Sequence, residues 1–274
     1  MSVEDAVAQH YTHGSLEREI LEALVASGKD LERLRPGDLA PADEFHLGGR
    51  QATIDFAEEL TVKPGMRLLD LGSGLGGAAR FFAHERGCRV TGIDLTAEYV
   101  AVARRLAQLV GLAETVSYRQ GSVLDLPFAP GSFDGVYMLH VGMNIEDKGR
   151  LFSQARRVLV PSGVFGIYDV MRTGPGDLSY PVPWASNDRT SFVAEPAVYR
   201  RLLEGAGFEV LNERNRREFA LESFRQMQAK AATGVPALGL HILMGSDARA
   251  KVANMLDNLR RGLIAPTEII CRVA

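Results

Sequence analysis

Apolar and polar residues along the middle of the chain fall into short blocks of two kinds. Short runs rich in apolar residues predict strands, and the segments between them have the three-to-four-residue apolar spacing of helices. Strands that alternate with helices in this way predict a mostly parallel sheet covered on both faces, the doubly wound α/β class. The predicted strands cover residues 67–71, 88–94, 116–120, 133–138 and 164–170.

Both ends of the chain add further elements to this core. A helical pattern is expected at the N-terminus, a break at Arg35–Asp38 with an extended segment at Pro41, and a second helix before the first strand. A Pro- and Gly-rich loop follows the fifth strand, and a long helical stretch precedes the last one. The expected ranges are helices 3–34, 49–60 and 195–206, the loop 171–190, strand 208–212, the helical stretch 221–261 and strand 268–273.

This order of elements favours one domain over residues 1–274 rather than two independent ones. Its expected parts are an N-terminal helical segment (1–60), a core (61–172) and a C-terminal part (173–274) with a helical cap at about 219–262. In mostly parallel sheets of this class, ligands bind at the edge formed by the carboxyl ends of the strands.

Composition narrows the class of protein. The chain has 274 residues, of which 46% are hydrophobic and 24% charged, and its net charge of -3 provides no global field for a polyanion. Nucleic acid is therefore not an expected partner. The two cysteines stand apart from any metal-ligand pattern, so no metal is expected and a reducing cytoplasm is favoured. The N-terminus lacks the pattern of a signal peptide, and no apolar run reaches the roughly 20 residues that cross a bilayer.

A glycine-rich loop carries the first chemical signal. Gly72-Ser73-Gly74-Leu75-Gly76-Gly77 fits GxGxxG between a predicted strand and a helix. Asp94 ends the next strand 22 residues after Gly72, close to the spacing of an acid that binds ribose hydroxyls. Asp70 precedes the loop, where a carboxylate suits a cofactor with an ammonium and a sulfonium but not a pyrophosphate. This argues for S-adenosylmethionine over NAD, and so against an NAD-dependent oxidoreductase.

Several further motifs complete a family resemblance. The segments are Leu68-Leu69-Asp70-Leu71-Gly72-Ser73-Gly74-Leu75-Gly76, Gly92-Ile93-Asp94-Leu95, Leu126-Pro127-Phe128, Phe133-Asp134-Gly135-Val136 and Arg157-Val158-Leu159-Val160-Pro161-Ser162-Gly163. As a set, they resemble the motifs of class I S-adenosylmethionine-dependent methyltransferases. The flanking segments 43–53 and 140–148 are similar to those of sarcosine/dimethylglycine-type and natural-product methyltransferases. The resemblance implies a Rossmann-like seven-stranded sheet whose last strand is antiparallel.

The resemblance also implies the residues that hold S-adenosylmethionine. Those expected to contact the cofactor are Asp70, Gly72, Ser73, Gly74, Asp94, Leu95, Ser122, Val123 and Met138. In this set Asp94 holds the ribose, Leu95 packs on the adenine, and Ser122 and Val123 lie at the polar edge of the adenine. Many members of the family have Asp where this chain has Ser122, which can still accept a weaker, uncharged hydrogen bond.

Three residues are candidates for the catalytic chemistry. His140 follows the fourth strand, and its unperturbed pKa near 6.5 suits a general base. His46 precedes the core and Tyr11 lies in the N-terminal helix; for all three, a packing or structural role is the alternative. The expected reaction is in-line displacement of the methyl group onto N or O of a small molecule. C-methylation of a natural product, a non-catalytic cofactor-binding module and a homodimer are left open. Methionines in the expected cap favour a partly apolar acceptor.

Overall fold

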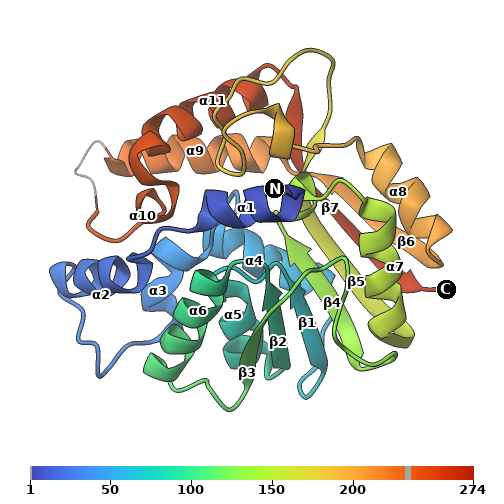
Figure 1. Cartoon of the computed structure of the whole chain (residues 1–274), viewed down its shortest axis with the longest axis horizontal. Coiled ribbons are helices and arrows are strands. Elements are labelled where there is room, and N and C mark those ends of the chain that lie inside the picture. Colours follow the sequence, from blue (N-terminus) through green and yellow to red (C-terminus); the bar gives the residue numbers. More distant parts are fainter. Residues whose placement is uncertain (1, 232–235) are drawn as a thin grey trace.

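The computed structural model describes residues 2–231 and 236–274. Within these ranges seven strands form one sheet: β1 (Arg67–Leu71), β2 (Arg89–Asp94), β3 (Val116–Gln120), β4 (Phe133–Leu139), β5 (Leu159–Arg172), β6 (Phe208–Asn215) and β7 (Ile264–Val273). Their order across the sheet is β3-β2-β1-β4-β5-β7-β6 (Figure 1). The pairs among β1 to β5 are parallel, whereas β7 pairs antiparallel with both β5 and β6. The predicted fold class is therefore confirmed.

Helices cover both faces of the sheet. On one face lie α4 (Gly49–Glu59), α5 (Gly77–Arg86) and α6 (Ala97–Leu109); on the other lie α7 (Lys148–Val158) and α8 (Pro196–Gly205). Successive residues of a strand point to opposite faces, so Leu68 packs under the first layer and Leu69 under the second. Both leucines are fully buried, and each contributes about 1.5–3 kcal/mol to folding by leaving water.

The N-terminal segment differs from the expected pattern. The predicted helix over residues 3–34 is two helices, α1 (Val3–Tyr11) and α2 (Leu16–Ala26). The predicted break and extended segment around Pro41 are wrong, because residues 36–43 form α3 (Pro36–Asp43). Pro36 occupies the first helical turn, where a missing N–H costs no hydrogen bond. Burial of Leu39 and Ala42 then outweighs the single bond that Pro41 removes.

The C-terminal helices lie above the carboxyl edge of the sheet, and α1 crosses the same edge (Figure 1). They are α9 (Arg217–Ala231), α10 (His241–Met244) and α11 (Ala248–Arg260), with three-residue 3-10 turns η1 (Gly142–Asn144), η2 (Asp188–Thr190) and η3 (Gly245–Asp247) elsewhere in the loops. Part of the expected helical stretch 221–261, residues 232–235, lies outside the described residues. The strand expected at 268–273 begins earlier, at Ile264, because residues 264–272 pair with residues 164–172 of β5.

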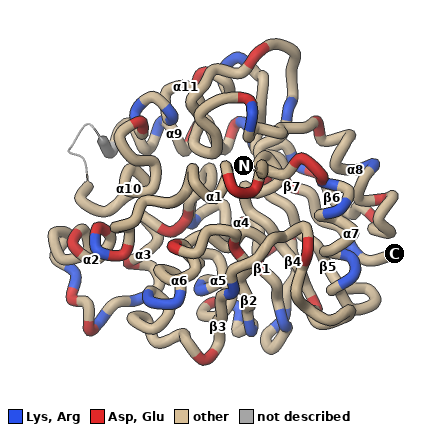
Figure 2. The backbone as a smooth tube through the Cα atoms, in the orientation of Figure 1, with Lys and Arg blue, Asp and Glu red and all other residues tan. Residues whose placement is uncertain are grey.

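Charged residues of both signs are interspersed over the surface helices (Figure 2). The first turn of α1 is acidic, with Glu4 and Asp5, and lies over the carboxyl edge of the sheet (Figure 2). No helix in the part of the chain that the structure describes is long and apolar enough to span a membrane.

Candidate active site

A cavity of about 1680 Å³ lies above the carboxyl ends of the parallel strands. Two parts of its wall are formed by different segments of the chain. The part that we call the loop half is lined by residues 70, 72–75, 94–96 and 121–123, which lie at or directly after the carboxyl ends of β1, β2 and β3. The part that we call the cap half is lined by residues from 45–51, 183–184, 219–228 and 238–255. The cavity thus joins the predicted cofactor loop to the predicted cap.

Two glycines of the loop are required for different reasons. Both have a positive φ, +68° at Gly72 and +53° at Gly74, which other L-residues adopt only with strain. A Cβ atom at Gly72 would lie 2.5 Å from Val141, so this glycine allows the loop to pack against the segment after β4. A Cβ at Gly74 would meet no atom within 4 Å, because it would project into the cavity. The missing side chain of Gly74 therefore leaves space in the cavity that a ligand can occupy.

Asp94 closes the loop half on the side of β2. Its two carboxylate oxygens accept hydrogen bonds from the backbone N–H groups of Gly74 and Thr96, each at 2.8 Å. Each carboxylate oxygen has about two acceptor positions, so Asp94 can accept more hydrogen bonds than these two backbone groups supply. Burial raises the pKa of Asp94, and the backbone bonds oppose this shift. The geometry fits the ribose role expected from the sequence.

Asp70 is a buried carboxylate without a cationic partner among the described residues. It is 3% exposed and lines the cavity. Burial raises the pKa of Asp70 to about 8; the Tyr137 hydroxyl opposes the shift, and the charges of Asp94 and Glu44 add to it. A cationic ligand beside Asp70 would favour its ionised form. The site therefore fits a molecule that brings positive charge to the glycine loop.

Leu95 and Val123 line the cavity as expected, next to Asp94 and Ser122. The Ser122 hydroxyl accepts from the Leu124 N–H at 3.0 Å and donates to the Glu4 carboxylate. Glu4 also lines the cavity, so α1 brings a carboxylate to the place where the sequence shows a serine instead of an aspartate.

Of the two remaining expected cofactor residues, Ser73 lines the cavity and Met138 does not. The buried Ser73 hydroxyl has no hydrogen-bond partner among the described residues and lies against Gly92, where a Cβ would be 2.6 Å from it. Met138 is fully buried in the core on the α7 side, and Leu139, the next residue of β4, lines the cavity instead. The alternation of β4 places Met138 on the face opposite Tyr137.

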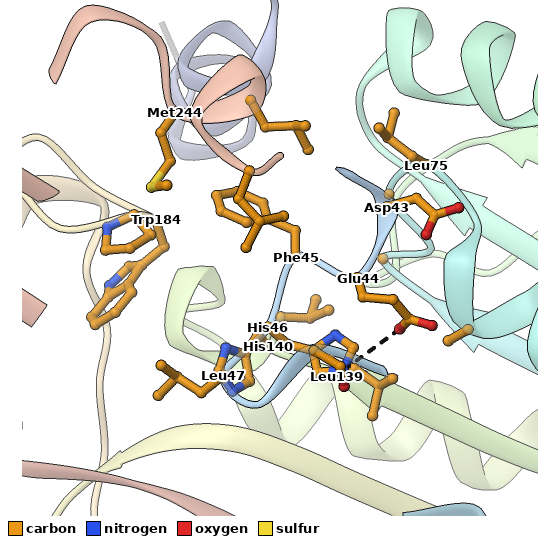
Figure 3. Close-up of a pocket in the computed structure, with 18 of the residues that line it drawn as sticks. Asp43, Glu44, Phe45, His46, Leu47, Leu75, Leu139, His140, Trp184 and Met244 are labelled. Carbon is orange, nitrogen blue, oxygen red and sulfur yellow. Dashed lines mark hydrogen bonds and ion pairs between the residues drawn. The ribbon is translucent and has the colours of Figure 1, made fainter. Parts of the chain in front are cut away.

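His140 follows β4 and lies on the floor of the cavity (Figure 3). Its φ of +55° is strained by roughly 1–2 kcal/mol, and its backbone N–H donates to the Tyr168 carbonyl at 2.7 Å. The ring centroid lies 5.1 Å from that of Tyr168 and 6.0 Å from that of His46. Burial, with a smaller contribution from His46, holds the pKa of His140 well below its usual value. The ring is therefore neutral at pH 7, and its buried Nε2 has no partner among the described residues.

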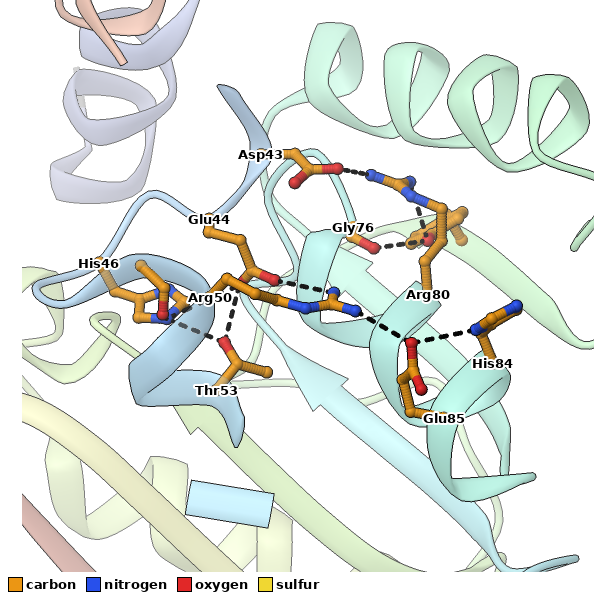
Figure 4. Close-up of polar contacts among 11 residues, drawn as sticks. Asp43, Glu44, His46, Arg50, Thr53, Gly76, Arg80, His84 and Glu85 are labelled. Carbon is orange, nitrogen blue, oxygen red and sulfur yellow. Dashed lines mark hydrogen bonds and ion pairs between the residues drawn. The ribbon is translucent and has the colours of Figure 1, made fainter. Parts of the chain in front are cut away.

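The protonation of His46 is fixed by its neighbours. Its Nε2 lies 3.1 Å from the Gly49 carbonyl oxygen and 3.0 Å from Thr53 Oγ1, which in turn donates to Glu44 Oε2 at 2.7 Å (Figure 4). A carbonyl oxygen only accepts, so Nε2 carries the proton. Burial lowers the pKa of His46 to about 4, and the bond to Gly49 opposes this shift. The neutral ring therefore has its lone pair on Nδ1.

Ion pairs hold the His46 segment against α5. Arg50 lies 3.4 Å from Glu44 and 3.4 Å from Glu85, and Arg80 pairs with Asp43 in the interior (Figure 4). Glu85 and Arg80 lie in α5, the helix that follows the glycine loop, so two of these three ion pairs join the His46 segment to that helix. Glu44, Thr53 and Glu4 were not among the residues predicted from the sequence.

Tyr11 is hydrogen-bonded rather than free. Its hydroxyl donates to Asn144 Oδ1 at 3.0 Å, and Asn144 Nδ2 donates to the carbonyl groups of Trp184 at 2.9 Å and Thr190 at 2.8 Å. Burial raises the pKa of Tyr11, with smaller contributions from Asp94 and Asp169, so the phenol stays neutral. Within the described residues no group of three His, Cys, Asp or Glu side chains is placed to hold a metal ion.

Comparison with known proteins agrees with this geometry. Residues 69–167, which include the end of β1, the glycine loop, Asp94 and His140, match a sequence family described as a methyltransferase domain. This part of the chain is therefore similar to a methyltransferase domain. The family resemblance carried by the motifs is thereby confirmed.

The chain has relatives of several kinds. A sterol 24-C-methyltransferase from Gibberella zeae is 36% identical over 118 residues, 43% of this chain and 31% of the relative. A glycine/sarcosine/dimethylglycine N-methyltransferase from Actinopolyspora halophila is 27% identical over 169 residues, 62% of this chain and 30% of the relative. The aligned part thus spans about a third of each relative's length. The structure of geranyl diphosphate C-methyltransferase from Streptomyces coelicolor shares the fold, with a TM-score of 0.72, 18% identity and coverage of 100% and 99% of the two chains.

Proposed function

We propose that the chain transfers a methyl group from S-adenosylmethionine to a small-molecule acceptor by in-line displacement. The observation that carries this proposal is Asp70, a buried carboxylate beside the glycine loop with a raised pKa and no cationic partner among the described residues. A ligand with an ammonium and a sulfonium compensates this charge, whereas the pyrophosphate of NAD would repel it. The similarity to a methyltransferase domain and the relatives support the same cofactor.

Each part of the cavity has a distinct task in this proposal. S-adenosylmethionine, when bound, supplies an electrophilic methyl group. The glycine loop and Asp94 orient the donor, and the walls of the cap half exclude water and align the acceptor atom. His140 is the candidate for the proton that an acceptor hydroxyl or amine loses, because its neutral ring lines the cavity, and burial, which lowers its pKa, makes it a weak base. Tyr11, whose hydroxyl is bound to Asn144, holds α1 in place rather than moving a proton.

Transfer to carbon is the second candidate. Relatives named as C-methyltransferases favour it, as do the His46 and His140 rings that line the cavity, since aromatic ring faces stabilise positive charge that develops on an acceptor. A methyl-transfer screen over phenols, amines and alkenes, followed by mass spectrometry of the product, distinguishes O, N and C transfer.

Calorimetry tests the cofactor directly. S-adenosylmethionine and its demethylated product, S-adenosylhomocysteine, are expected to bind the full chain with 1:1 stoichiometry, and NAD is expected not to bind. Binding of NAD without the other two ligands would overturn the proposal. Binding of S-adenosylmethionine without methyl transfer to any acceptor in the screen would favour a non-catalytic cofactor-binding module.

A further inference from the structure

The buried part of the wall of the cap half is made mainly of apolar side chains. Phe224, Leu243, Met244 and Met255 are each less than 10% exposed and come from α9, α10 and α11. Trp184, which is 2% exposed, packs in one cluster with Phe224 and Met255, and Met244 lies beside it (Figure 3). Methionine and aromatic side chains provide adaptable, polarisable contacts for hydrocarbon.

Cations are scarce on the wall of the cavity. Among the described lining residues the only lysine or arginine side chains are those of Arg50 and Arg249, and three histidines, His46, His140 and His241, also line the cavity. Arg50 is engaged by Glu44 and Glu85 and stacks on the Phe81 ring at 4.4 Å, whereas Arg249 is exposed. A phosphate or carboxylate buried in the cap half would therefore lack the compensating charge that burial demands.

The carboxylates on the wall are equally committed. Asp43 is paired with Arg80, Glu44 with Arg50 and Thr53, and Glu222 with Arg225 at the surface. The remaining acidic lining residues of the described set are Glu4, Asp70 and Asp94, and both aspartates belong to the loop half. An ammonium group in the cap half would therefore find no free carboxylate there.

The volume of the cavity sets the scale of the acceptor. Pockets for single drug-sized ligands have roughly 300–1,000 Å³, so a cavity of about 1680 Å³ leaves roughly 700 Å³ for an acceptor even with a generous allowance for the cofactor. A small amino acid derivative would leave most of this space unfilled.

We infer that the acceptor is a neutral, largely hydrocarbon molecule of drug-like size, held in the cap half with its single reactive group toward His140. The inference rests on the proposed methyl transfer but adds the charge and polarity of the substrate. It separates this chain from methyltransferases whose acceptor carries a phosphate, a carboxylate or an ammonium group.

The chain offers a built-in probe for the test, since Trp184 is its one tryptophan. The full chain, saturated with S-adenosylhomocysteine, is titrated with farnesol, farnesyl diphosphate and farnesylamine, which share one hydrocarbon and differ in charge. The Trp184 emission should report farnesol binding at least tenfold tighter than binding of either charged analogue, and dimethylglycine should give no saturable change. Equal or tighter binding of the diphosphate or the amine, or no farnesol binding, would overturn the inference.

Matched variants locate the site. Met244→Glu places a charge in the cap half and should weaken farnesol binding at least tenfold. Met227→Glu introduces a charge at a lining position that is 43% exposed, where the fold tolerates the change. This variant should weaken farnesol binding severalfold. Leu211→Glu is the control, because Leu211 is 50% exposed on β6 and does not line the cavity. Equal affinities in Met227→Glu and Leu211→Glu would contradict the site. S-adenosylhomocysteine affinity, measured in parallel, shows separately whether the proposed cofactor binding holds.

Discussion

The loop half and the cap half of the cavity are built in different ways. The loop half consists of short segments directly after β1, β2 and β3, and backbone groups hold it, such as the Gly74 and Thr96 N–H groups on Asp94. The cap half combines segments as distant in sequence as Phe45 and Met255, and side chains form its surface. The donor site is thus encoded by local chain geometry, whereas the acceptor site depends on packing between remote helices.

The largest effect is expected from Gly74→Val. The new side chain would project into the loop half, so affinity for S-adenosylhomocysteine should fall at least 100-fold in calorimetry. Gly111→Val is the matched control, since Gly111 also has a positive φ of +71° and no atom within 4 Å of a Cβ, but lies on the surface after α6. Both variants carry about 1–2 kcal/mol of backbone strain, and only Gly74→Val should lose binding. Full binding by Gly74→Val would refute the loop half as the donor site.

His140→Asn tests the junction of the two halves. Asparagine tolerates the left-handed φ of this position better than other side chains, so the backbone is preserved while the proposed base is removed. With an acceptor that loses a proton, kcat should fall by about 10²–10⁴-fold, because that is the usual contribution of general base catalysis. S-adenosylhomocysteine affinity should change less than about twofold. An unchanged kcat would remove His140 from the mechanism.

The difference between the loop half, built from local segments, and the cap half, built from remote ones, explains which features the sequence predicts well. The strands, the glycine loop and the positions of Asp70 and Asp94 follow from period, turn chemistry and spacing, all of which are local. The family resemblance implies that Met138 contacts the cofactor, yet the two-residue period of β4 turns it into the core and brings Leu139 to the cavity. A shift of one residue in a strand decides such a role.

Residues that act through another side chain are harder to predict. Glu44, Thr53 and His46 form a chain of hydrogen bonds only because α3 and α4 fold toward each other. The hydrogen bond between Ser122 and Glu4 joins residues that are 118 positions apart in the sequence, so no local spacing rule predicts it. The helix at residues 36–43 was missed because Pro41 signals a break, although tertiary burial overrides that local cost.

Asp70→Asn gives an intermediate effect and links binding to pH. Because the pKa of Asp70 is about 8 in the free protein, the cationic cofactor must select the ionised form. Wild-type affinity for S-adenosylmethionine should therefore rise by close to tenfold per pH unit between pH 6 and 7, with proton release. Asp70→Asn should bind S-adenosylmethionine about tenfold more weakly than wild type at pH 7.5, and its affinity should not change with pH. Calorimetry in buffers of different ionisation enthalpy measures both the affinity and the number of protons released. A wild-type affinity that does not change with pH would contradict the pairing of Asp70 with the cationic cofactor.

The stability of the free protein provides an independent check on Asp70. A carboxyl group whose pKa is raised from 3.8 to about 8 binds more protons when folded, so its contribution to stability is full below pH 4 and is lost as pH rises through 8. Without cofactor, Asp70→Asn should therefore melt at a higher temperature than wild type at pH 8.5. Equal melting temperatures at that pH would show that Asp70 is not held in an unfavourable environment.

The smallest effect is expected at Thr53, which acts on the cap half through His46. Thr53→Val keeps the shape but removes the hydroxyl that joins His46 to Glu44, so the fold should lose about 1–3 kcal/mol and kcat should fall severalfold. Thr53→Ser retains the hydroxyl and should restore both values. A purely structural role would lower the melting temperature alone, whereas a positioning role also changes the imidazole ¹⁵N shifts of His46, which report the proton on Nε2. Unaltered shifts and kcat in Thr53→Val would show that the bond to the Gly49 carbonyl orients His46 without Thr53.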